Sequence, residues 1–319
     1  MSAEIDYMID RRNLRRKVTL WRVLSLALVA IAVLLALALA GVFDDLGTKG
    51  KHIARVSISG VITEDRKFLN LLKSIRKDEN VKGVVLAIDS PGGTTVGGES
   101  TFHAIRELAE AKPTVASVGT LAASAGYMVA SASDHIVARH SSIVGSIGVM
   151  IQYPQASALM EKIGVEMKEV KSSPLKAEPS PFHEAPPEAV ANLQMLIDDS
   201  YNWFVDLVTD RRPMGRAEVL KVADGRVFSG KRGMDLKLVD ALGGEDQAKK
   251  WLVDEKGLDK ELELIDWKVA QDRNGLLFSQ SLWTWLLGDS AAHLIGSDPT
   301  AGLLPKRLFL DGLLSIWQK

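Results

Sequence analysis

A serine and a lysine in two separate stretches have the side chains needed for nucleophilic catalysis. Ser124 lies in AASAG, after a predicted strand, and Lys176 lies between apolar residues in the proline-rich stretch SSPLKAEPSPF. A serine hydroxyl attacks a carbonyl when a base takes its proton, and a lysine amine can be that base where burial lowers its pKa. The small residues beside Ser124 would leave room for a substrate. Ser124 could equally be an ordinary N-cap, and Lys176 an ordinary surface charge.

Histidine is the more familiar base for a serine nucleophile. No histidine stands in a setting that indicates an orienting aspartate, so we do not expect a Ser-His-Asp triad. The six histidines are His52, His103, His135, His140, His183 and His293. The chain has no cysteine, which excludes a thiolate nucleophile and a disulfide framework.

A second stretch that could take part in the chemistry is DSPGG, which follows a buried-looking predicted strand. Pro91 fixes the turn, and Gly92 and Gly93 let the backbone approach a bound group closely. Backbone N–H groups presented after a strand can bind an oxyanion or a phosphate. A tight turn between a strand and a helix would have the same sequence.

The elements that must position these residues alternate between strands and helices. The run GVVLAID is continuously apolar, as in a strand covered on both faces. Alternation of this kind predicts a largely parallel sheet and an α/β fold. We predict strands at 52–62, 83–89, 113–118, 135–138, from near 146 and at 165–171, and helices at 67–78, 99–111, from 124 and at 186–212.

The N-terminal region contains an uncharged apolar run, Val23–Phe43. At 1.5 Å per residue a helix of this length spans roughly 30 Å, the thickness of a bilayer core. Five basic residues lie within 11–17 and two aspartates follow the run, which predicts a cytoplasmic N-terminus and an extracytoplasmic remainder. The alternative is a cleaved signal peptide, because Ala38–Ala40 resembles a cleavage site, although the apolar run is long for one.

The overall composition is that of an ordinary globular protein. The chain has 319 residues, of which 46% are hydrophobic and 25% charged, and its formal net charge is -1. This length allows one large or two small domains. A nearly neutral chain lacks the basic surface that a nucleic-acid partner requires.

Five stretches together resemble the signal peptide peptidase A family of membrane-anchored bacterial Ser-Lys peptidases. They are DSPGG, GTLAASAGY, GSIGVM, PLKAEPSPF and DGRVFSGKRGMDLKLVDALGG, and their order fits from Ile53 to about Leu258. The resemblance is to the short form, with one catalytic domain per chain. It implies the Clp protease/crotonase fold, a superhelix of ββα units, behind an N-terminal transmembrane helix. The expected regions are 1–22 (cytoplasmic), 23–43 (transmembrane), 44–258 (peptidase) and 259–319 (apolar extension).

Carried over by position, the resemblance assigns roles to individual residues. It implies that Ser124 is the nucleophile, that Lys176 is the general base, and that Ser146 hydrogen-bonds the lysine amine. The residues around Lys176 depart from the family, because Leu175 and Pro174 stand where relatives often have tyrosine and glycine. Lys171 is therefore the alternative base.

The resemblance also implies an oxyanion hole and a peptide-binding edge. Backbone N–H groups of Gly92 or Gly93 and of Ala125 would hold the oxyanion. An extended substrate would pair with strand-like edges after Gly93 and after Ser146.

The implied activity is degradation of cleaved signal peptides in or at the membrane, without cofactor or metal. In the family, nucleophile and lysine come from adjacent subunits or repeats. This chain has one repeat, so its partner would be another copy in a homo-oligomeric ring on the membrane.

Two alternatives are a crotonase-type acyl-CoA enzyme and a non-catalytic membrane scaffold on the same fold. The apolar extension would pack on the domain or a neighbour, or lie on the membrane.

Overall fold

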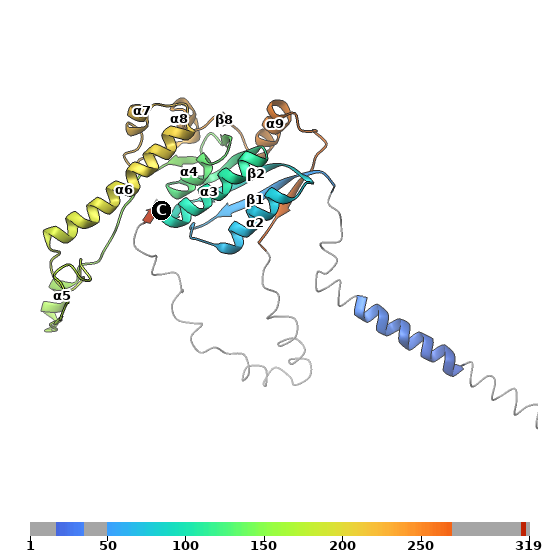
Figure 1. The fold of residues 1–319 in the computed structure, drawn as a ribbon, viewed down its shortest axis with the longest axis horizontal. Helices are drawn as coiled ribbons and strands as arrows, with labels where there is room; N and C mark the ends of the chain where they lie inside the picture. The colour runs from blue at the N-terminus through green and yellow to red at the C-terminus, as the bar shows by residue number, and fades with distance from the viewer. Residues whose placement is uncertain (1–16, 35–49, 270–313, 317–319) are drawn as a thin grey trace, which may run out of the picture. The chain divides into compact units, whose positions relative to one another are not determined.

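The computed structural model describes residues 17–34, 50–269 and 314–316 (Figure 1). The chain divides into two compact units, Met1–Gly50 and Lys51–Lys319. In the first unit, the helix Lys17–Leu34 is long and apolar enough to cross a membrane, by length and composition. Residues 35–43 of the predicted span lie outside the described residues, as does most of the predicted extension.

One mixed sheet forms the centre of the second unit. Its main path is β7-β6-β4-β2-β1-β9, with β5 beside β4 and β8 beside β5 (Figure 1). Every pair is parallel except β6 with β7. This confirms the predicted α/β class. The strands are β1 (His52–Ser59), β2 (Val81–Ser90), β4 (Thr114–Ala123), β5 (His135–Ala138), β6 (Ile143–Gly145), β7 (Val227–Ser229), β8 (Ala241–Leu242) and β9 (Leu264–Trp267).

Helices connect these strands and cover the sheet. Asp65 caps the first of them by accepting hydrogen bonds from the Lys67 and Phe68 N–H groups, and Gly257 ends the last in a left-handed conformation. The predicted helices at 67–78, 99–111 and 186–212 are confirmed, although the second begins four residues earlier. The helices are α2 (Arg66–Lys77), α3 (Thr95–Ala111), α4 (Ala125–Ser131), α5 (Ser157–Lys162), α6 (Pro187–Arg211), α7 (Arg216–Leu220), α8 (Gly230–Asp235) and α9 (Glu245–Lys256).

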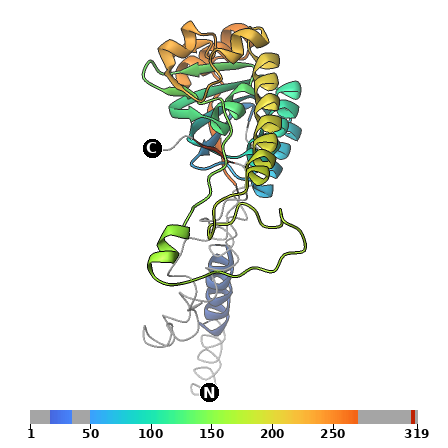
Figure 2. The same ribbon diagram turned by 90° about the vertical axis from the view of Figure 1, so that its left-hand side faces the viewer.

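The central strands bury side chains on both faces of the sheet. Alternate residues of β1, β2, β4 and β5 enter two separate apolar cores, as the period of a strand requires. Helices α2, α3 and α6 lie together on one side (Figure 2), while α9 packs against the other core. The larger core includes Val56, Leu86, Val118 and Ile136, and the smaller one Ile53, Val85, Val115 and Val137.

The predicted strand at 165–171 is wrong. These residues form no strand in the structure, and Val165, Met167 and Val170 are exposed. Alternating side chains form a strand only where a neighbouring strand supplies hydrogen-bond partners, and no strand within the described residues pairs with this segment. The strand predicted to begin near Ser146 is also wrong, because β6 ends at Gly145 and residues 146–149 are not in a strand.

Residues 151–200, called the arm below, extend away from the sheet. They contain α5, a long loop and the first part of α6, and both views show α5 and this loop apart from the strands (Figures 1 and 2). The buried residues of α6 lie mostly in its second half, from Phe204 to Val208. Beyond that end, the buried Arg212 guanidinium binds Asp240 through two hydrogen bonds of 2.9 and 2.6 Å. The C-terminal half of α6 is thus anchored to the rest of the unit.

The sheet continues beyond residue 258, where we predicted the peptidase region to end. Strand β9 pairs in parallel with β1, with Ile53 opposite Leu264 and Val56 opposite Trp267. Arg55 on β1 donates to Asp266 on β9 at 3.0 Å. Residues to 267 therefore belong to the sheet.

Candidate active site

The two predicted site serines follow the ends of neighbouring parallel strands. Ala123 at the end of β4 is the register partner of Gly145 at the end of β6. Ser124 and Ser146 are the next residues, and the Ser124 N–H donates to the Gly145 carbonyl oxygen at 2.8 Å. Their exposed fractions are 1% and 7%, so both residues are buried. The carboxyl ends of parallel strands are where α/β proteins bind ligands.

Ser124 occupies a strained turn between β4 and α4. Its φ is 57° and its ψ is -121°, outside the regions that residues with a Cβ normally adopt. Strain of this kind costs about 1–3 kcal/mol and concentrates at functional sites. A nucleophilic serine on a sharp strand-to-helix turn is a known arrangement in hydrolases. The Ser124 side chain makes no capping hydrogen bond to α4, so the ordinary N-cap interpretation is wrong.

The small residues around Ser124 allow α4 to pack closely. The three alanines of AASAG are fully buried. A Cβ at Gly126 would lie 2.7 Å from the Ser90 carbonyl oxygen, and one at Gly98 of α3 would lie 3.1 Å from the Ala125 Cβ. These positions are therefore filled by the contacts of α4 with β2 and α3. That packing explains why the residues at these positions are small. We predicted that their small size would leave room for a substrate.

The glycine turn after β2 forms a short strand, β3 (Gly92–Thr94). The Ile62 N–H donates to the Gly92 carbonyl oxygen at 2.8 Å, and the Thr94 N–H donates to the Ile62 carbonyl oxygen at 2.9 Å. The Gly92 N–H donates to Ser90 Oγ at 3.1 Å. An oxyanion bound by the Gly92 N–H would therefore compete with the Ser90 hydroxyl.

The other edge of β3 is paired with the end of the same chain. Strand β10 (Leu314–Ile316) runs antiparallel to β3, with Ser315 opposite Gly93. The edge at which we predicted a substrate to pair thus holds an extended segment of the protein itself.

Lys176 lies in the loop of the arm between α5 and α6. Its N–H closes a turn onto the Ser173 carbonyl oxygen at 3.2 Å, and the residue is exposed. Ser124 and Ser146 are buried at the sheet. The described part of a single chain shows no hydrogen bond between the Lys176 amine and either serine. One copy of the chain therefore does not assemble the predicted dyad.

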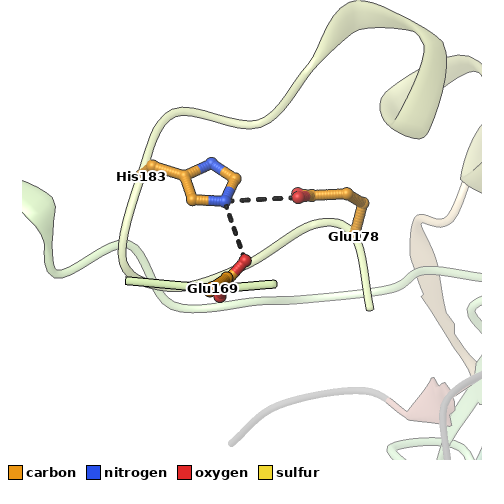
Figure 3. Close-up of side chains that lie close together, drawn as sticks. All are labelled: Glu169, Glu178 and His183. Carbon is orange, nitrogen blue, oxygen red and sulfur yellow. Dashed lines mark ion pairs between the residues drawn. The ribbon is translucent and has the colours of Figure 1, made fainter. Parts of the chain in front are cut away.

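Lys171, the alternative base, is held between two carboxylates. Its Nζ lies 2.5 Å from Glu169 Oε2 and also donates to Glu178 Oε1. These hydrogen bonds, the one to Glu169 first, raise the pKa of Lys171. His183 Nε2 approaches the same carboxylates, 3.2 Å from Glu178 and 3.6 Å from Glu169 (Figure 3). A lysine kept protonated in this way is a poor proton acceptor.

His135 has an aspartate close by but lies at the wrong end of the sheet. Its Nδ1 is 3.8 Å from Asp240, and its ring stacks on Trp251. Burial lowers the pKa of His135. It pairs with Val115 near the start of β4, and Ser124 lies nine residues further along that chain, about 30 Å away at the rise of a strand. His135 therefore cannot serve Ser124.

Comparison with known proteins identifies relatives over most of the chain. The family described as "Peptidase family S49" matches residues 106–259. A Synechocystis sp. protein with a provisional protease name is 38% identical over 218 residues, 68% of this chain and 78% of that protein. An Enterococcus faecium protein provisionally named signal peptide peptidase SppA is 31% identical over 290 residues, 86% of this chain and 78% of its own length. "Serine protease SPPA, chloroplastic" of Arabidopsis thaliana is 35% identical over 192 residues, 60% of this chain but 28% of that protein.

The sheet, its covering helices and this family match define an α/β protein of the Clp protease/crotonase-like fold. The chain belongs to peptidase family S49 and is of the SppA type. Membership supports a serine protease and speaks against a crotonase-type acyl-CoA enzyme.

Proposed function

We propose that this chain is a serine endopeptidase with Ser124 as nucleophile and Lys176 as general base. The Lys176 amine takes the hydroxyl proton as Ser124 Oγ attacks a peptide carbonyl. The amine product then leaves with that proton, and water hydrolyses the acyl-enzyme. The observation that carries the proposal is the strained strand-to-helix turn at Ser124, whose side chain does not cap the helix and whose neighbour at the next strand end is Ser146.

Polar groups near Ser124 would complete the site. Ser146 would hydrogen-bond the lysine amine, which its place beside Ser124 supports. The oxyanion would be held by the N–H of Ala125 and by that of Gly93 or Gly92. Ala125 is the first residue of α4, so its N–H has no acceptor within that helix.

Gly93→Ala should lose at least about 10²-fold in kcat/KM on a fluorogenic peptide, because displacing an oxyanion donor by an ångström has effects of this size. A Cβ at Gly93 would lie 1.7 Å from the Ile62 carbonyl oxygen, so β3 must shift. Gly119→Ala is the matched control, since its Cβ would lie 3.4 Å from the nearest atom, the Ile88 carbonyl oxygen. A fully active Gly93→Ala variant would contradict the assignment of this turn.

The lysine would come from a second copy of the chain. The exposure of Lys176 and of the arm that carries it supports this arrangement. Within residues 50–269, eleven of the large apolar side chains that are exposed lie on the arm, against three elsewhere, so the arm has the composition of a contact surface. A head-to-tail contact of arm and site would close into a ring. The eleven are Tyr153, Leu159, Ile163, Val165, Met167, Val170, Leu175, Phe182, Val190, Met195 and Leu196.

The proposed substrates are extended apolar peptides, in particular signal peptides already released from secreted proteins. A peptide would pair with β3 in place of β10, with main-chain hydrogen bonds giving affinity. Two exposed valines, Val61 and Val96, lie close in sequence to Ile62 and β3 and suit an apolar peptide. The name of the Enterococcus faecium relative agrees with this substrate class.

We place the enzyme on the cytoplasmic membrane, with the peptidase unit outside the cytoplasm. The apolar helix Lys17–Leu34 and the basic residues before it support this topology. A reporter fused after Lys319 should be active only outside the cytoplasm. A mature N-terminus just after Ala40 would replace the anchor with a cleaved signal peptide.

Labelling with a fluorophosphonate probe tests the proposed nucleophile. The probe should modify the wild-type protein at Ser124, as located by peptide mass spectrometry, and should leave Ser124→Ala unlabelled. Ser142→Ala is a control, because this buried serine donates to the Gly119 carbonyl oxygen and has no proposed role. Labelling at another serine would overturn the assignment.

A further inference from the structure

The loop of the arm contains a cluster of charged side chains that the proposed mechanism does not use. Lys171 donates to both Glu169 and Glu178, and His183 lies beside the two carboxylates (Figure 3). The Ser180 N–H donates to Glu178 Oε2 at 3.0 Å. Only 3% of the Glu178 side chain is exposed. Burying a carboxylate is costly unless charged or hydrogen-bonding partners compensate for the lost water. Here Lys171 and the Ser180 N–H are those partners.

Glu178 stands two residues after Lys176, within the same run of turns. The Lys176 N–H donates to the Ser173 carbonyl oxygen at 3.2 Å, and the Glu178 N–H to the Leu175 carbonyl oxygen at 3.4 Å. Between them, Ala177 has a left-handed φ of 61°. A residue with a Cβ holds that conformation only where its surroundings enforce it. The Glu178 carboxylate lies just C-terminal to this turn and is bound by Lys171 and by the Ser180 N–H.

A metal ion is the other occupant that such a cluster suggests. Glu169, Glu178 and His183 offer ligand atoms that lie within 4.8 Å of one another. The Lys171 ammonium, however, already binds both carboxylates and supplies the positive charge that a cation would bring. The cluster is therefore complete as an ion-pair network.

We infer that Glu178 is a positioning residue for Lys176 and that Lys171 is its partner. This inference rests on the proposed role of Lys176 as base. A lysine amine sits on a flexible four-carbon stem, so its reach to a serine in another subunit depends on where the backbone holds its Cα. The ion pair between Lys171 and Glu178 fixes the backbone on one side of the turn. Misplacing a catalytic group by about 1 Å can cost 10²-fold in rate.

Glu178→Gln keeps the size of the side chain and removes its charge. We expect kcat to fall by about 10- to 100-fold while KM changes little, since the substrate-binding edge is untouched. Glu166→Gln is the matched control, because Glu166 also pairs with a lysine of the arm, Lys168, at 3.4 Å, but on its exposed surface. Hydrogen exchange over residues 169–183 should become faster in Glu178→Gln alone. A Glu178→Gln enzyme with wild-type kcat overturns the inference.

Substitutions at Lys171 separate positioning from proton transfer. Lys171→Arg keeps the ion pairs but cannot act as a base, and we expect it to retain most of the activity. Lys171→Met should lose as much kcat as Glu178→Gln, and the double variant should lose no more than either one, because both remove the same contact. If Lys171→Arg is as inactive as Lys171→Met, Lys171 acts chemically and the inference is wrong. These variants also decide the matter if Glu178→Gln does not fold.

Two further measurements isolate this inference from the proposed function. If Lys176→Ala is inactive while the Glu178 and Lys171 variants match wild type, only the inference fails. If Lys176→Ala is fully active, the proposed base fails and the inference fails with it. Treatment with a chelator should leave activity unchanged; a loss that zinc restores would show that a metal, rather than Lys171, holds the loop.

Discussion

Peptide hydrolysis should fall by about 10³-fold or more when Ser124 is replaced by alanine, and by a similar factor in Lys176→Ala. When two residues act as one catalytic unit, removing either one stops the work of both. Each single variant should therefore lose nearly as much activity as the double variant. The measurement is kcat/KM on a fluorogenic peptide. Unchanged melting temperatures would show that both variants remain folded.

The control for this pair is the other lysine of the loop. Lys176 is exposed in the single chain, whereas Lys171 is held by Glu169 and Glu178, which raise its pKa. Near-normal turnover in Lys176→Ala, together with loss of all turnover in Lys171→Ala and in Lys171→Arg, would reverse the assignment of the base.

Mixing the two inactive variants should restore activity. Ser124→Ala subunits still present Lys176, and Lys176→Ala subunits still present Ser124. If each active site lies at a contact between two subunits, random exchange in an equal mixture gives intact pairs at about a quarter of the contacts. We therefore expect about a quarter of the wild-type rate, measured after subunits labelled with two fluorophores show energy transfer.

The same mixture can also contradict the proposal. If energy transfer shows that the subunits exchange but no hydrolysis returns, both groups of the dyad must come from one chain. The arm would then have to fold back toward its own sheet. A mixture of Ser124→Ala with the double variant Ser124→Ala/Lys176→Ala is the negative control, because it contains no intact nucleophile.

Local sequence pattern was enough to predict the central elements of the fold. The strand His135–Ala138 has its predicted bounds, and the apolar run GVVLAID lies within β2. The long helix α6 agrees with its predicted range to within one residue at each end. The apolar residues of each of these elements form either a continuous run or a helical period, and such local patterns indicate the extent of an element.

Features that depend on distant contacts were not predicted. The run Val165–Lys171 alternates like a strand, but no strand in the described part of the chain pairs with it. Only small residues fit in AASAG because α4 packs closely against α3 and β2. No local sequence pattern indicates that packing. Glu178 stands seven residues from Lys171, and its pairing depends on the course of the intervening loop. The sequence named the candidate residues, whose roles remain predictions, but it did not indicate the contacts that surround them.

The pairing of β10 with β3 has a consequence for how peptides bind. Both edges of β3 are taken, one by Ile62 and the other by β10, so an incoming strand must displace a segment of the same molecule. A tethered competitor acts at an effective concentration on the order of millimolar. In the proposed binding mode, a short soluble peptide would therefore need enough affinity to displace β10, whereas a peptide at high local concentration would displace it more easily.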